Sequence, residues 1–287
     1  MSNLSLVNLD KIAESIASVA NNLINKVSAA TGWAFSTKGL KLAQEEAHKK
    51  IIDEIAERAD VDVYERRQLI NMYTDFSKKN ENVVKILSKS FKYLEEGANP
   101  QDISDDWIMD FVDKASKISD EGMQELWSNL IAGEANKPNS FSKRLLHTLS
   151  IMSYKDAEIF LNLTRFCFFD VSDEYLLHPI IFIKRRTGSY AKSRITSDTL
   201  NDMASLGLIQ CDYNQGFKFD RRKHFHYQNK FITVENDIID AGNVKFTPMG
   251  HMLTRISEKQ NHEKILDFTI EEWSHRGYKV TVERRDR

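Results

Sequence analysis

The residues best suited to chemistry gather in one segment, Glu125 to Leu149, which reads ELWSNLIAGEANKPNSFSKRLLHTL. Glu134 lies where one predicted helix ends, and Lys143 and Arg144 lie where the next begins. Helix dipoles disfavour both placements, so these charges need partners. A structural Glu134–Arg144 ion pair is the simplest hypothesis. The alternatives are an anion or partner site, formed by the two cations and the free N–H groups of residues 140–142, and a catalytic site.

The rest of this segment has a packing explanation. Apolar residues at helical spacing are predicted to face a core: Leu126, Trp127, Leu130 and Ile131 in the first helix, and Leu145, Leu146 and Leu149 in the second. Gly133 permits close backbone approach, and Pro138 ends the first helix. Asn139 or Ser140 is predicted to cap the next helix, which starts near Phe141.

A second segment mixes cations with aromatic rings and could contact phosphates or stacked bases. Its residues are Arg221, Arg222, Lys223, Phe225, Tyr227 and Lys230. The range 184–230 holds ten basic and four acidic residues, which favours nucleic acid in this half of the chain. Asp198 and Asp202, in the predicted recognition helix, oppose it. His224 and His226 have no third ligand at a characteristic spacing, so no metal site is predicted.

The elements that must position these residues begin with helices. Residues 4–30 carry an apolar stripe, which predicts a helix for core packing or self-association. Residues 38–59 and 64–94 form an αα-hairpin, and 105–118, 120–135 and 141–152 are shorter helices. Ser119 and Ser153 are predicted N-caps, and Ser153 opens a helix ending near Phe169. Cys167, in that helix end, is expected to be buried.

The pattern then becomes mixed. It predicts strands at 175–183, 231–235, 244–247 and 278–282, and helices at 196–206, 248–256 and 263–274; a hairpin at 208–219 turns at 214–216. These features resemble a winged-helix module. The predicted fold is mainly α with a smaller α+β part, an N-terminal helical bundle followed by a winged-helix-like module. The predicted domains are 1–60 (amphipathic helices), 61–170 (helical) and 171–287 (winged-helix-like α+β).

Composition narrows the classes of protein. The net charge of −2 implies no overall attraction to polyanions. Cys167 and Cys211 are too few and too far apart for a disulfide framework or a zinc site. No secretion signal or membrane-spanning run is found, so a cytoplasmic protein is expected. Phosphate-loop, dinucleotide, zinc-protease and nucleophile-elbow motifs are missing, which predicts no cofactor and favours a non-enzymatic protein.

The central segment resembles a bacterial family known as domain of unknown function 2806. Abortive-infection alpha proteins are similar across the same corner, the turn between the helix that ends near Glu134 and the helix that starts near Phe141. The residues that carry the resemblance are Asp106-Trp107, Ser119-Asp120-Glu121, Gln124, Leu126-Trp127, Leu130, Ala132-Gly133-Glu134, Pro138, Ser140-Phe141-Ser142 and Arg144, with Arg66-Arg67-Gln68 and Asn71 upstream. It covers about residues 60–170. Two positions depart from the family pattern, Asn139 where Gly is common and Leu145 where Thr is common. The resemblance implies a cytoplasmic bacterial protein from phage-defence or mobile-element neighbourhoods, with no agreed catalytic residue.

Three functional hypotheses follow. The first is a non-enzymatic phage-defence or stress protein that binds a protein partner, or itself, through the N-terminal helix. The second is a winged-helix regulator that binds DNA or RNA through the C-terminal module. The third is an effector enzyme that uses Glu134 and Arg144.

Overall fold

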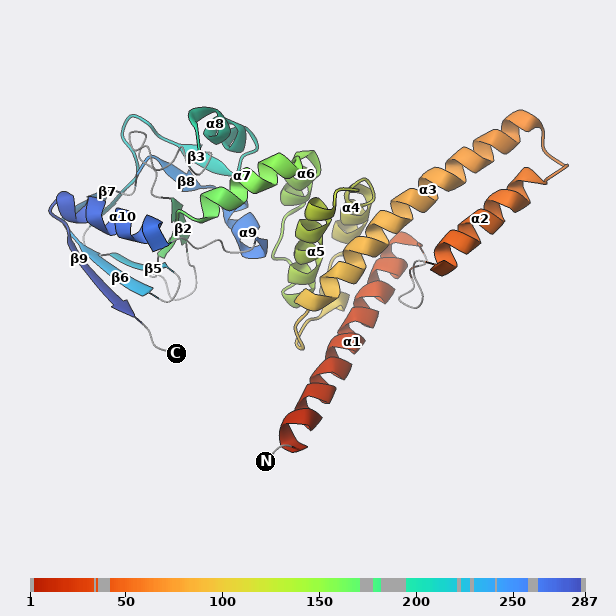
Figure 1. Ribbon diagram of the computed structural model, residues 1–287, viewed down its shortest axis with the longest axis horizontal. Coiled ribbons are helices and arrows are strands. Elements are labelled where there is room, and N and C mark those ends of the chain that lie inside the picture. Colours follow the sequence, from red (N-terminus) through yellow and green to blue (C-terminus); the bar gives the residue numbers. More distant parts are fainter. Residues whose placement is uncertain are drawn as a thin grey trace. The chain divides into compact units, whose positions relative to one another are not determined.

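The N-terminal helix α1 (Asn3–Thr31) belongs to the first of two compact units of the computed structural model, Met1–Ser150 and Ile151–Arg287 (Figure 1). The structure describes residues 3–33, 35, 42–170, 178–181, 195–220, 223–227, 230–240, 242–257 and 263–284. The described chain is mainly helical with a smaller antiparallel sheet, as predicted.

Unit 1 contains six helices along the described chain. After α1 come α2 (Leu42–Ala56), α3 (Val63–Ser90), α4 (Asp105–Ala115), α5 (Glu121–Asn136) and α6 (Lys143–Ile151), with short 3₁₀ turns at Phe91–Tyr93 and Pro100–Asp102. The C-terminal half of the α1 stripe is buried and α1 packs against α4, where Lys26 and Asp105 form a 2.6 Å ion pair. This half of the stripe therefore stabilises unit 1 itself.

Helices α2 and α3 form the predicted αα-hairpin. Asp62 caps α3 by accepting the backbone N–H of Tyr64, and the rings of His48 and Tyr73 stack between the two helices. The fully buried residues of α3 begin only at Val83, where the helix packs against α5. Residues 42–56 and 63–80, here called the arm, lie side by side beyond α4 and α5 (Figure 1).

Unit 2 is built on antiparallel strands. Its elements are α7 (Tyr154–Thr164), β1 (Cys167–Asp170), β2 (His178–Ile181), α8 (Ser197–Ser205), β3 (Ile209–Cys211), β4 (Lys218–Asp220), β5 (Lys223–Tyr227), β6 (Lys230–Glu235), β7 (Ile238–Asp240), β8 (Val244–Phe246), α9 (Pro248–Ile256), α10 (Glu263–His275) and β9 (Lys279–Arg284). The main sheet has the order β3-β8-β2-β1-β5-β6-β9, and β4 pairs with β7 in a second sheet. Buried side chains of β1, β5 and β6 pack with Leu266 and Trp273 of α10.

Two predictions for this unit are wrong. The segment around Cys167 is strand β1 and not a helix end, because α7 stops at Thr164 and the chain pairs with β2 and β5. The predicted hairpin at 208–219 does not form, since β3 pairs with β8 and β4 pairs with β7. Asp212 accepts the N–H groups of Asn214 and Gln215, and this turn leads the chain away from β3.

Candidate functional site

Helix α5 places Glu134 at the corner, the turn of residues 137–142 between α5 and α6. Asp120, not Ser119, caps the start of this helix and accepts the N–H of Met123 at 2.9 Å. Trp127 is buried and lies 5.4 Å from the ring of Phe111. Its indole N–H has no hydrogen-bond acceptor in the described part of the chain. These apolar anchors fix the helix end from which Glu134 projects.

The Glu134 carboxylate binds the backbone of the loop that follows. It accepts N–H groups from Asn139 at 2.6 Å, Ser140 at 3.1 Å and Phe141 at 2.9 Å, and the residue is only 2% exposed. Burial raises the pKa of Glu134, and the three N–H donors oppose that shift. The loop is thus an anion-binding turn that holds the protein's own carboxylate.

This geometry corrects one expectation and restricts another. The Glu134–Arg144 ion pair is wrong: these two described residues form none, and Arg144 is exposed. The N–H groups of Ser140 and Phe141 are not free for an external anion, because Glu134 accepts both. Two of the three N–H groups predicted for an anion site are therefore occupied by a carboxylate of the same chain.

The backbone turns at Asn139, which has a φ of 65°. Asparagine tolerates this left-handed conformation better than most residues, which explains how a residue other than glycine occupies this position. Ser142, and not Asn139 or Ser140, then caps α6 by accepting the N–H of Leu145 at 3.4 Å.

The first turn of α4 closes the corner from the other side. The indole N–H of Trp107 donates to the Phe141 carbonyl at 2.8 Å, and Lys143 pairs with Asp106. The adjacent residues Trp107 and Asp106 thus bind Phe141, just before α6, and Lys143, its first residue. Six of the residues that carry the family resemblance therefore meet at this joint: Asp106, Trp107, Glu134, Ser140, Phe141 and Ser142.

The structure does not place the described residues predicted to bind nucleic acid on one common surface. Arg221 and Arg222 lie outside the described residues. Phe225 and Tyr227 are buried in the core against α10, and the Tyr227 hydroxyl donates to the Arg165 carbonyl at 2.9 Å. Strand alternation places both rings on the core face, so they cannot stack on bases. Lys223 and Lys230 are half-buried.

The histidine pair is also placed. His224 lies 3.0 Å from the Thr233 hydroxyl through its Nδ1 atom, in a cross-strand pair between β5 and β6. Within the described ranges, no three His, Cys, Asp or Glu side chains are grouped so that they could hold a metal ion. None of the helices described is long and apolar enough to cross a membrane.

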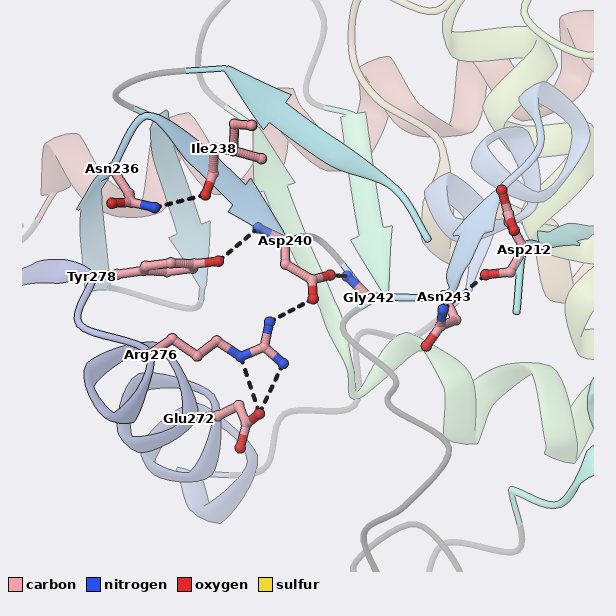
Figure 2. A network of polar contacts seen from close by, with 9 residues as sticks. All are labelled: Asp212, Asn236, Ile238, Asp240, Gly242, Asn243, Glu272, Arg276 and Tyr278. Atoms are coloured by element: carbon pink, nitrogen blue, oxygen red, sulfur yellow. Dashed lines mark hydrogen bonds and ion pairs between the residues drawn. The ribbon is translucent and has the colours of Figure 1, made fainter. Parts of the chain in front are cut away.

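Sequence reasoning missed a polar network in unit 2 (Figure 2). Arg276 donates to Asp240 at 2.5 Å and to Glu272 at 3.0 Å, which connects β7 to α10. Asp240 also accepts the Gly242 N–H at 2.8 Å, and its own N–H donates to the Tyr278 hydroxyl. The Glu272–Arg276 pair has i, i+4 helical spacing, but Asp240 lies 36 residues from Arg276, and local spacing in the sequence does not reveal that contact. The network fixes the small β4–β7 sheet to α10.

Comparison with known proteins gives one match. A family model described as "Protein of unknown function (DUF2806)" matches residues 65–268. No curated protein and no solved structure gives a significant match. The matched range includes the corner, the sheet up to β8, and α9.

Proposed function

Because this chain belongs to the DUF2806 family, and its corner resembles abortive-infection alpha proteins, we propose that it is a non-enzymatic phage-defence or stress protein. In this proposal it acts in the cytoplasm by binding another protein. The corner supports the non-enzymatic assignment, since both Glu134 oxygens are engaged by the backbone and Arg144 lies apart from them.

The observation that carries the proposal is an exposed apolar face on the arm. Tyr64 is 69% exposed, Met72 68% and Phe76 43%. Met72 and Phe76 are four residues apart and share one side of α3, where the Phe76 ring also contacts Trp33, and Tyr64 lies about two turns nearer the start of the helix. Grouped apolar side chains at a soluble surface commonly mark a protein-binding site.

The surroundings of this face suit a helical partner. The Asp75–Lys79 ion pair, at 2.6 Å, adds a polar border beside the apolar side chains. An apolar centre with a polar rim is the usual anatomy of a protein interface. An amphipathic helix with apolar residues three and four positions apart fits such a face.

The test is survival of a bacterial host expressing the full chain under phage challenge. Wild type is expected to lower the efficiency of plating, and Tyr64→Ser/Met72→Ser to lose at least tenfold of that protection. Lys49→Ser/Asp53→Ser, at exposed polar positions of α2, is the matched control and should protect fully. No protection by wild type contradicts the defence role; full protection by the apolar variant contradicts the arm as the interface.

Nucleic-acid binding is a second candidate, favoured by one observation. Lys230 of β6 lies directly opposite Arg284 of β9. Like charges in this position destabilise a strand pair, and a phosphate would relieve the repulsion. Binding of labelled duplex DNA and RNA across a salt series tests it: Lys230→Ala should weaken binding and flatten the salt dependence. Absence of binding at low salt rejects this candidate.

A further inference from the structure

Strand β9 ends the main sheet with an exposed edge. It pairs with β6 through six residues, from Lys230↔Arg284 to Glu235↔Lys279, and no described strand pairs with its other side. Residues 281–284 are exposed, and Val282 is 41% exposed. The unpaired backbone groups of an edge strand form a template for another strand.

The two faces of β9 differ in chemistry. Val280 packs against the core cluster on the α10 side, and Val282 follows on the same face because side chains alternate. Lys279, Thr281 and Glu283 lie on the opposite face. There Lys279 forms a 3.1 Å ion pair with Glu235 of β6.

We propose that β9 pairs antiparallel with β9 of a second copy of this chain, with a two-fold axis at Thr281. This register sets Lys279 opposite Glu283, Val280 opposite Val282, and Thr281 opposite itself. Symmetry repeats the ion pair and the valine pair on each side of the axis. Opposite charges and β-branched residues are favourable cross-strand pairs.

The charges of Lys279 and Glu283 favour this register, and they favour a second copy of β9 as the strand that pairs with this edge. A shift of two residues sets Lys279 opposite Thr281 in one direction and Val280 opposite Arg284 in the other, and both lose the Lys279–Glu283 pairs. A shift of one residue sets Lys279 opposite Arg284 in one direction, which is repulsive, and opposite Val282 in the other, which loses the Lys279–Glu283 pairs. Charged residues on an edge normally discourage pairing. Here the same strand carries both halves of a complementary pattern, which favours a second copy over an unrelated strand.

The experiment measures the mass of the full chain in solution by light scattering and sedimentation equilibrium. Wild type is expected to be a dimer. Glu283→Lys places lysine opposite Lys279 and should weaken dimerisation at least about tenfold, since two attractive pairs become repulsive. Lys279→Glu should do the same. The exchange Lys279→Glu/Glu283→Lys restores opposite charges and should restore the dimer.

A crosslink tests the axis independently. Thr281→Cys should give a covalent dimer under mild oxidation, whereas Asn214→Cys, at an exposed loop, should not. A monomeric wild type overturns the proposal, as does a dimer that ignores Glu283→Lys or is not recovered by the charge exchange. Pairing of β9 with a strand of another protein in place of its own copy also overturns it.

Discussion

Glu134 and Phe141 are joined by a 2.9 Å hydrogen bond from the Phe141 backbone N–H to the Glu134 carboxylate, within one turn of chain between α5 and α6. The Phe141 carbonyl accepts the Trp107 indole N–H. One residue therefore connects the ends of three helices. The segment between Glu134 and Phe141 has the residue types of an active site, but its contacts connect helices α4, α5 and α6.

Replacing Glu134 with Gln should destabilise unit 1. The amide has one acceptor oxygen and turns N–H groups toward the loop donors, so the free energy of unfolding should fall by about 1–3 kcal/mol. Urea unfolding followed by circular dichroism measures it. Lys143→Ala, which removes only the exposed pair with Asp106, should cost less than about 1 kcal/mol. Equal effects of the two changes would contradict the joint.

The raised pKa of Glu134 gives stability a pH dependence. The folded chain holds this proton at a higher pH than the unfolded chain does, so stability falls as pH rises from the usual value of 4.5 through the raised pKa. Glu134→Gln lacks this contribution. The difference in unfolding free energy between wild type and Glu134→Gln should therefore be largest below 4.5 and shrink through that window. If this difference in unfolding free energy grew with pH instead, the pKa of Glu134 would be lowered by folding and not raised.

Asn139 tests the left-handed turn. Asn139→Gly should leave the melting temperature unchanged or slightly higher, because glycine adopts a φ of 65° without strain. Asn139→Ala should lower the free energy of unfolding by about 1 kcal/mol, since its Cβ disfavours this conformation. Thermal unfolding of both variants gives the comparison, and equal melting temperatures would contradict it.

Gly250 lies where α9 meets the segment before β3. A Cβ built there would be 1.9 Å from the Leu208 carbonyl oxygen, a backbone atom that cannot swing away. Gly250→Ala should therefore cost about 3 kcal/mol or more and lower the soluble yield. Gly97→Ala is the control, since its Cβ would meet no atom within 4 Å. A folded Gly250→Ala protein of wild-type stability would refute this close approach.

Arg276 tests the network of Figure 2. Lysine keeps the charge but cannot hold Asp240 and Glu272 with the same planar group, so Arg276→Lys should cost about 1–2 kcal/mol. Hydrogen exchange should accelerate at the backbone N–H groups of β4 and β7. Lys117→Ala, in an exposed pair with Asp113, should leave those rates unchanged. Unchanged exchange in Arg276→Lys would show that the network does not hold these strands.

Local patterns predicted the helices well. The predicted helix 248–256 has the bounds of α9, with Pro248 in its first turn, and Ser153 forms the predicted capping box with Asp156. Such features depend on residues a few positions apart. Burial of Cys167 was also confirmed.

Long-range pairing was not predictable in the same way. The partner of β3 is β8, with strands β4 to β7 between them along the chain, and residue types do not identify it. At the corner, Glu134 was assigned to Arg144 because charges are visible in a sequence and backbone N–H groups are not. The asparagine after Pro138 was the one available signal, since it permits the turn that points those groups inward.

The strand order of unit 2 has a consequence for how the chain is made. Helix pairs such as α2–α3 can form soon after synthesis, whereas β6 waits for β9, whose residues are translated more than forty positions later. Folds that depend on distant pairings form slowly and expose unpaired edges meanwhile. Unit 1 is therefore expected to fold during translation, and the β6 edge is the segment most in need of a chaperone until β9 arrives.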